Sequence, residues 1–227
     1  MKLIKLIILS IVCVSIANAQ QTPAEVQSKT VAIVGGTAHL GNGSVIQNSL
    51  IIFENEILQT VSEYNKSEDL SKMEVIDAKN QHIYPGFIVA NSTLGLIEID
   101  AVRATDDDEE LGNWNPHIRS LIAYNAESRV VESMRPNGVL IAQITPRGGR
   151  ISGTSSIVQL DAWNWEDAVL RVDDGIHLNW PSTFSRGRWW LGEDPGLKSN
   201  PKYSNQTSEI KAYFNNAKAN SNNAKAK

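Results

Sequence analysis

The stretch Tyr84-Pro85-Gly86-Phe87-Ile88-Val89 marks the point where the pattern of the sequence changes. Before it, short apolar runs alternate with turns rich in glycine and asparagine, which is typical of β-strands. After it, apolar runs flank a helical pattern that begins at Ser128 and ends before Gly138, a residue that commonly stops helices. A strand, a helix and a further strand in this order predict an α/β structure. The sequence therefore predicts a β-rich part, followed by an α/β part.

Five short strands are predicted before this junction. They cover residues 30–34, 49–53, 57–61, 74–77 and 82–84. The segment Glu54-Asn55-Glu56 separates two of them and is expected to be a hairpin tip. Asn55 readily adopts the left-handed conformation, whereas Glu56 does so only at an energetic cost. We therefore do not expect the ideal two-residue hairpin turn.

The first nineteen residues have the three parts of a secretory signal peptide. Lys2 and Lys5 precede a short apolar run, and Ala17-Asn18-Ala19 supplies small residues for cleavage. We therefore expect residues 1–19 to be removed and the mature protein to be exported, to the periplasm or the extracellular space. A retained N-terminal anchor is the alternative, although the apolar run is short for a membrane span. No stable span is expected after cleavage.

The mature chain is expected to be acidic and free of thiols. Loss of residues 1–19 removes two lysines and no acidic residue, so the formal net charge changes from −4 to −6. The only cysteine, Cys13, is lost as well. Nucleic acid is therefore not an expected partner, because no broad basic field remains. A small-molecule substrate and a second copy of the chain are the partners that stay open.

The end of the chain is predicted to contain an amphipathic helix. Residues 205–219 place Ile210, Tyr213, Phe214 and Ala217 at helical spacing. The asparagine-, alanine- and lysine-rich residues 220–227 are predicted to be a disordered tail.

The β-rich part and the junction together resemble the opening of the amidohydrolase superfamily, most closely its imidazolonepropionase-like branch. The resemblance rests on Ile33-Val34-Gly35-Gly36-Thr37, Val75-Ile76-Asp77-Ala78-Lys79 and Pro85-Gly86-Phe87-Ile88, and residues 145–156 extend it to an exported subgroup. It implies a small β-sandwich part over residues 20–84 and a (β/α)8, or TIM, barrel of the metal-dependent hydrolase type. Such a barrel needs about 250 residues. Residues 85–204 are therefore expected to form an incomplete barrel, as in a truncated member.

The resemblance also locates a departure at the metal site. Members normally continue with Asp-x-His-x-His, whose histidines bind zinc or a similar divalent ion. Asn91 and Thr93 stand at the two histidine positions, and Val89 stands at the aspartate position. An amide and a hydroxyl are poor ligands for a transition metal. The remaining histidines have no metal-ligand spacing in the sequence; they are His39, His82, His117 and His177.

The resemblance implies hydrolysis of non-peptide or cyclic C–N bonds. Asn91 and Thr93 at the two histidine positions imply instead that this chain binds no metal and is inactive, that is, a pseudoenzyme. The alternative is a non-catalytic exported binding protein on the same scaffold. Its contact surface would be residues 147–156 together with a group of tryptophans that otherwise belong in the core. These tryptophans are Trp163, Trp165, Trp180, Trp189 and Trp190.

Two groups of side chains are candidates for chemistry or binding. Asp173, Asp174 and His177 are candidates for a proton-transfer group, which would allow a metal-independent hydrolase. The glycine-rich stretch is a candidate for holding a carboxylate or a phosphate, or is simply a tight turn. Its candidate ligand-binding residues are Arg147, Gly148, Gly149, Arg150, Ser152 and Thr154.

Overall fold

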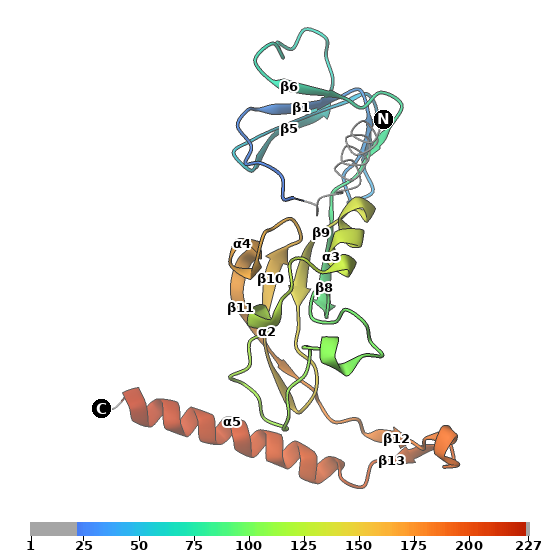
Figure 1. Cartoon of the computed structure of the whole chain (residues 1–227), viewed down its shortest axis with the longest axis vertical. Helices are drawn as coiled ribbons and strands as arrows, with labels where there is room; N and C mark the ends of the chain where they lie inside the picture. The colour runs from blue at the N-terminus through green and yellow to red at the C-terminus, as the bar shows by residue number, and fades with distance from the viewer. Residues whose placement is uncertain (1–21, 226–227) are drawn as a thin grey trace, which may run out of the picture. The chain divides into compact units, whose positions relative to one another are not determined.

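The computed structural model describes residues 22–225, which form two compact units (Figure 1). Of these residues, unit 1 contains 22–90, 126–142 and 158–168, and unit 2 contains 91–125, 143–157 and 169–225. The predicted signal peptide, residues 1–19, lies outside the described residues. No helix within residues 22–225 is long and apolar enough to cross a membrane.

The largest sheet of unit 1 has the strand order β5-β4-β1-β6. Strand β1 (Val31–Val34) is antiparallel to β4 (Ser49–Glu54) and parallel to β6 (Glu74–Asp77), and β5 (Ile57–Glu63) pairs with β4. Because side chains alternate along a strand, every second residue faces the same side. The buried residues of this side form an apolar cluster of Ala32, Val34, Leu50 and Ile52. These strands match the sequence prediction closely.

The tip of the hairpin between β4 and β5 differs from its prediction. Glu54 pairs directly with Ile57, and the two residues between them, Asn55 and Glu56, both have positive φ angles of 50° and 65°. The turn therefore has two residues after all. Such turns are favoured because their backbone twist matches the twist of the flanking strands, which outweighs the cost of the left-handed conformation at an exposed glutamate.

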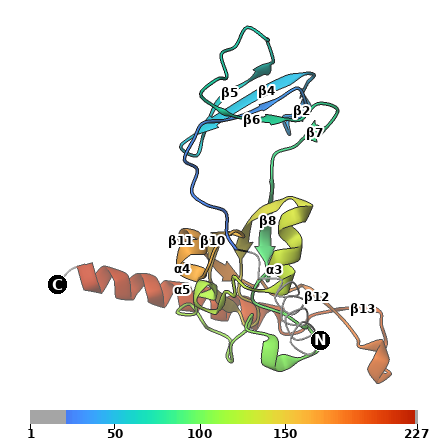
Figure 2. The same ribbon diagram turned by 45° about the horizontal axis from the view of Figure 1, so that its top comes forward.

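A second sheet of unit 1 contains two strands that the sequence analysis missed. Its order is β3-β2-β7, with β2 (Thr37–His39), β3 (Val45–Ile46) and β7 (His82–Ile83). Strand β2 is parallel to β7, and both are visible side by side in Figure 2. The missed strands, β2 and β3, have three and two residues. They are too short to show a recognisable alternation of apolar residues.

Helix α3 (Arg129–Met134) of unit 1 lies where the sequence predicts it. The Ser128 hydroxyl accepts hydrogen bonds from the backbone N–H groups of Val130 and Val131, which caps the first turn. A 3-10 turn, η2 (Arg135–Asn137), extends the helix to Gly138, whose φ is 85°. Glycine adopts this left-handed conformation at little cost, and the helix stops there.

A further four-stranded sheet has the order β11-β10-β9-β8. Its strands are β8 (Phe87–Ser92), β9 (Val139–Ile144), β10 (Ile151–Gln159) and β11 (Val169–Leu178). Only six residues, 145–150, connect β9 with β10, and α4 (Trp165–Ala168) before β11 has a single turn. A parallel crossover needs a dozen or more residues. The structure therefore shows a mixed α/β fold with small sheets and few helices, and it does not show the predicted (β/α)8 barrel.

The last part of unit 2 contains an antiparallel hairpin and a long helix. The hairpin pairs β12 (Phe184–Arg186) with β13 (Leu197–Ser199) and carries the 3-10 turn η3 (Trp189–Leu191). Helix α5 (Tyr203–Lys225) is longer than the predicted 205–219 and includes most of the predicted tail. Residues 220–225 contain three asparagines and a serine, which favour helices less than alanine and lysine do, so helix propensity does not explain this extension. Shorter elements of unit 2 are η1 (Arg103–Thr105) and α2 (Ser120–Ala123).

The tryptophans do not fill a core as predicted. The side chains of four of them are between 52% and 71% exposed; these are Trp163, Trp180, Trp189 and Trp190. They lie in connections and at the hairpin, where few other residues surround them.

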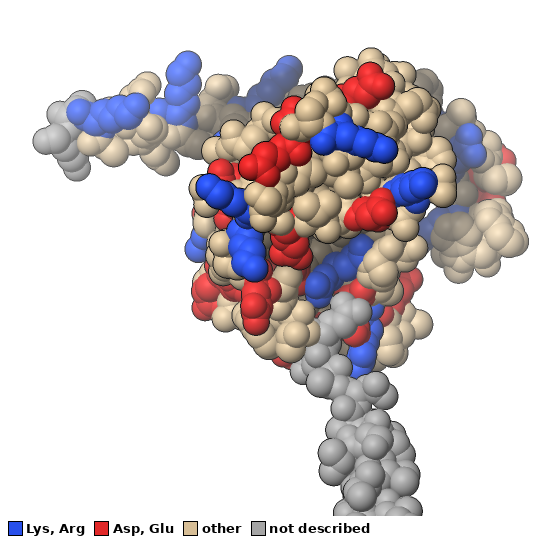
Figure 3. Space-filling model, turned by 90° about the horizontal axis from the view of Figure 1, so that it is seen from above, with Lys and Arg blue, Asp and Glu red and all other residues tan. Residues whose placement is uncertain are grey.

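The face of the molecule in Figure 3 carries basic and acidic side chains interspersed with uncharged ones.

Candidate functional site

The two neighbouring carboxylates of β11 have different partners. Asp173 accepts a hydrogen bond from Arg119 Nε at 2.9 Å, and the Thr154 hydroxyl lies 3.3 Å from it. Asp174 accepts from Ser155 Oγ at 2.6 Å and from Gln143 Nε2 at 2.8 Å. Consecutive residues of a strand point to opposite sides, so the two side chains cannot act on one group. Of the three candidates for a proton-transfer group, Asp173 therefore lies apart from Asp174.

His177, the third candidate, joins Asp174 through a serine. Its Nε2 lies 2.8 Å from Ser155 Oγ, and the Ser155 side chain is fully buried. A hydroxyl has one proton, and the short bond to Asp174 assigns that proton to the carboxylate. His177 Nε2 must then donate to Ser155. Burial lowers the pKa of His177, the Asp174 carboxylate opposes this shift, and the Arg147 guanidinium adds to it. The imidazole is therefore neutral at neutral pH.

Gln143 connects Asp174 to Asn91, which stands at the first of the two expected histidine positions. Its Oε1 accepts a hydrogen bond from the backbone N–H of Asn91 at 3.1 Å. Asn91 in turn is held by Arg147, which donates from Nη1 to the amide oxygen at 2.5 Å and from Nη2 to the backbone oxygen at 2.7 Å. The φ of Asn91 is 53°, a left-handed value that asparagine tolerates better than most residues.

These contacts form one continuous set of side chains within unit 2, which we call the polar row. It consists of Arg147, Asn91, Gln143, Asp174, Ser155 and His177. Strands β8, β9, β10 and β11 each contribute at least one member. The sequence analysis singled out four members and missed the roles of Gln143 and Ser155. Gln143 is a polar residue inside an apolar run, which is a signal in the sequence, whereas Ser155 lies among other hydroxyl residues and gives none.

The glycine-rich stretch is held as a turn by a residue that the sequence analysis did not consider. Asn179 Nδ2 donates to the carbonyl oxygens of Gly148 and Gly149, both at 3.1 Å, and to Ser152 Oγ at 2.9 Å. Ser152 Oγ also donates to the Gly148 oxygen at 2.7 Å.

Two backbone N–H groups of this stretch are engaged as well. Those of Arg147 and Arg150 donate to the carbonyl oxygens of Asp108 and Asn113. The Thr154 hydroxyl donates to the Ile118 oxygen at 3.1 Å. An anion-binding loop needs N–H groups that point at the ligand. The contacts of Asn179 and Ser152 are those of a tight turn, and anion binding by this stretch stays a prediction.

Arg150 lies at a groove of about 320 Å³ in unit 2. The groove is lined by polar and charged residues and one aromatic ring; they are Asn113, Trp114, Arg150, Lys202, Asn205, Gln206 and Glu209. The Trp114 ring stacks on Tyr213 of α5, with ring centres 4.5 Å apart and planes inclined by 11°. The groove thus combines a fixed aromatic ring with two cationic side chains.

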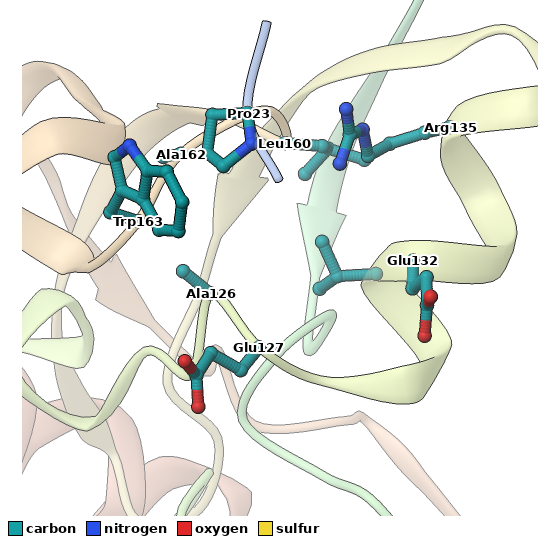
Figure 4. A pocket seen from close by; sticks show the side chains of 9 residues that line it. Pro23, Ala126, Glu127, Glu132, Arg135, Leu160, Ala162 and Trp163 are labelled. Carbon is teal, nitrogen blue, oxygen red and sulfur yellow. The ribbon is translucent and has the colours of Figure 1, made fainter. Parts of the chain in front are cut away.

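A smaller pocket lies in unit 1 beside α3 (Figure 4). Pro23, Leu160, Ala162 and Trp163 line it together with Arg135, and its volume is about 30 Å³. This volume is about that of one water molecule in the liquid. Arg135 is also engaged in an ion pair with Asp161. The pocket is therefore too small to be a substrate site.

The residues at the expected zinc position do not fit a zinc ion. Asn91 already accepts two hydrogen bonds from a guanidinium, whose positive charge would repel a second cation. Zinc in proteins is bound by histidine, cysteine and carboxylate ligands. Among residues 22–225, no three such side chains come together in a group that could hold a metal ion.

Two histidines that the sequence spacing left apart are in contact in unit 1. His39 Nε2 lies 2.9 Å from His82 Nδ1, because β2 and β7 are neighbouring parallel strands. The two histidines are 43 residues apart in the sequence, and they come together only because β2 and β7 are neighbours in the sheet.

Comparison with known proteins gives a likeness of fold. No protein-family model and no curated protein sequence matches the chain. The chain is similar in structure to an amidohydrolase from Thermotoga maritima MSB8, with a TM-score of 0.69 and 18% sequence identity. A prolidase in complex with N-methylphosphonate-L-proline has a TM-score of 0.35 and 16% identity over 50% of this chain and 25% of the prolidase.

The likeness to the Thermotoga protein covers 86% of this chain and 49% of the Thermotoga chain. The present chain therefore spans about half the length of that protein. The fold of this chain is accordingly similar to that of about half of the Thermotoga protein.

Proposed function

We propose that this chain is an exported protein of amidohydrolase type, of the imidazolonepropionase-like branch, that does not carry out metal-dependent hydrolysis by itself. The observation that carries the proposal is the double hydrogen bond from Arg147 to Asn91. It occupies the backbone and side-chain oxygens of the residue that would have to begin the metal site.

The polar row supports the same proposal through its other members. Asp174 accepts two hydrogen bonds, and its partner Ser155 is fully buried. A nucleophile or a general base must come within hydrogen-bond distance of the substrate. A buried hydroxyl that donates its only proton to a carboxylate does not meet this requirement. The row therefore connects strands and does not attack a substrate.

An activity measurement on the purified chain tests this proposal. We expect no hydrolysis of a cyclic amide or a dipeptide after incubation with zinc. The matched variant Asn91→His/Thr93→His, combined with Arg147→Gln, is expected to retain more zinc than the unmodified chain. Turnover by the unmodified chain that a chelator abolishes and zinc restores would contradict the proposal.

A second candidate function is binding without catalysis, which the groove beside α5 favours. Arg150 and Lys202 supply two positive charges against the one negative charge of Glu209, and the Trp114 ring is held in place by its stacking on Tyr213. Cations and a fixed ring suit a small ligand that carries a carboxylate and an apolar or planar part.

A thermal-shift screen with amino acids and N-acyl amino acids tests this candidate. A ligand that raises the melting temperature should lose its effect in Arg150→Gln and keep it in Arg129→Gln, an exposed arginine of unit 1. An equal shift in both variants would rule out the groove as the binding site.

A further inference from the structure

The imidazole rings of His39 and His82 face each other across two parallel strands of unit 1. Thr37 of β2 is opposite His82 of β7, and His39 is two residues further along β2, so it lies on the same face as Thr37. This register brings His39 Nε2 within 2.9 Å of His82 Nδ1. Figure 2 shows the two strands next to each other.

A neighbouring aromatic ring holds one of these imidazoles. Tyr84 stacks on His39, with ring centres 4.3 Å apart and planes inclined by 8°. Its ring centre lies 6.3 Å from that of His82. The stacked tyrosine limits rotation of the His39 ring, so the position of its Nε2 is defined before any ligand arrives.

We propose that His39 and His82 form a binding site for one divalent transition-metal ion of the Cu²⁺ or Ni²⁺ class. Between two neutral imidazoles, one of the facing nitrogens carries a proton and the other accepts it. A shift of that proton to the outer nitrogen of the same ring leaves a lone pair on each facing nitrogen. Both can then bind the same ion as neutral imidazole ligands, the form that metals require.

The distance between the two nitrogens selects the kind of metal. Two ligands about 2.0–2.1 Å from an ion and 2.9 Å apart subtend an angle of about 90° at that ion. This angle suits the tetragonal geometry of Cu²⁺ and Ni²⁺, whereas tetrahedral zinc would need its two nitrogens about 3.3 Å apart. The general order of affinity for nitrogen ligands also places Cu²⁺ highest.

The surroundings leave room for the remaining ligands of such an ion. His39 and Tyr84 line an open groove of about 450 Å³, whose other walls include Gly41, Gly43, Ser44 and Val45. No lysine or arginine is among the residues that line it. His82 is not part of this lining but is itself exposed, so water molecules can reach the facing nitrogens from the solvent and complete the coordination.

Titration of the full-length chain with Cu²⁺ alone tests the site. We use a Cys13→Ser background, so that no thiol competes for the ion. One Cu²⁺ should bind per chain, with two nitrogen ligands visible in its electron paramagnetic resonance spectrum. His39→Gln and His82→Gln should each weaken binding by more than about tenfold, because even loss of an outer partner of a metal ligand costs that much. The matched control, His117→Gln, replaces an exposed histidine of unit 2 and should bind as the parent does.

Unchanged Cu²⁺ affinity in either His39→Gln or His82→Gln would overturn the proposal, as would an equal loss in His117→Gln. If the single variants fail to fold, the parent chain decides the question. Paramagnetic Ni²⁺ should then broaden the ring signals of His39 and His82 in a nuclear magnetic resonance spectrum before those of His117 and His177. Broadening of all four histidines at the same Ni²⁺ concentration would refute the site.

Discussion

The two units differ in what they bury. Both units bury apolar side chains, such as Leu50 in unit 1 and Leu121 and Ile144 in unit 2. Unit 2 buries more hydroxyl and amide side chains than unit 1, which buries Ser49 and Ser128; those of unit 2 are Asn115, Ser120, Thr145, Ser152, Ser155 and Ser156. Apolar burial stabilises a fold directly, whereas a buried polar group must find a hydrogen-bond partner to avoid a penalty. Stability in unit 2 therefore depends more on complete hydrogen bonding, in addition to packing, than it does in unit 1.

The largest expected effect is on the apolar side of this comparison. Leu50→Ala should lower the free energy of unfolding by about 2–5 kcal/mol, because it removes buried methyl groups and leaves a cavity. Denaturant unfolding measures the change. Leu58→Ala, at a side chain that is 65% exposed in the same hairpin, is the control and should change stability much less. Equal effects would mean that the cluster does not carry the stability of this sheet.

The second-largest effect is expected at a buried hydroxyl of unit 2. Ser155→Ala should lower the free energy of unfolding by about 1–3 kcal/mol, because a partly buried carboxylate oxygen and an imidazole N–H lose their partner. The cavity contribution is small, since the two side chains differ by one atom. Unfolding curves for both variants under the same conditions give the comparison. A neutral result for Ser155→Ala would show that water replaces the hydroxyl.

A smaller effect, of opposite sign, is expected at the hairpin tip of unit 1. Glu56 adopts a left-handed conformation that glycine reaches more easily. Glu56→Gly should therefore raise the free energy of unfolding by up to about 1 kcal/mol. Thermal unfolding measures it. A loss of stability would mean that the added freedom of the unfolded chain outweighs the relieved strain.

The smallest expected effect is a dependence of stability on pH through His177. Because burial lowers its pKa in the folded state, the unfolded chain takes up the proton first as the pH falls. The contribution of this histidine is therefore constant above the ordinary histidine pKa of about 6.5 and falls as the pH drops below it. Melting temperatures between pH 8 and pH 5 should fall less steeply for His177→Gln than for the parent. A steeper fall for the variant would contradict the direction of the shift.

The local features of the fold could be predicted because they depend on neighbouring residues. The strands of the first sheet follow from alternation of apolar residues, and α3 follows from the Ser128 cap and the Gly138 stop. The hairpin turn was mispredicted because the twist of the paired strands outweighs the preference of one glutamate. The incomplete barrel was expected from the family resemblance alone, and the structure shows a mixed α/β fold with small sheets and few helices, in which the short connection 145–150 joins β9 to β10.

The contacts of the candidate site could not be predicted because they depend on strand order. Gln143, Ser155 and Asp174 are separated by many residues and meet only because β9, β10 and β11 are neighbours. The same holds for His39 and His82, which are 43 residues apart. A single sequence gives the direction of side chains along a strand, but not which strands become neighbours.

The polar row has a fixed direction. Arg147 can only donate hydrogen bonds and an ionised Asp174 can only accept them. The bonds therefore run from the guanidinium through Asn91 and Gln143 to Asp174, and from His177 through Ser155 to the same carboxylate. Asp174 is the single point where both branches end, so its charge sets the orientation of the Gln143 amide, the Ser155 hydroxyl and the His177 imidazole. A neutral amide that presented its N–H to Ser155 would force the branch to His177 to reverse, whereas the branch from Arg147 cannot reverse, because a guanidinium only donates.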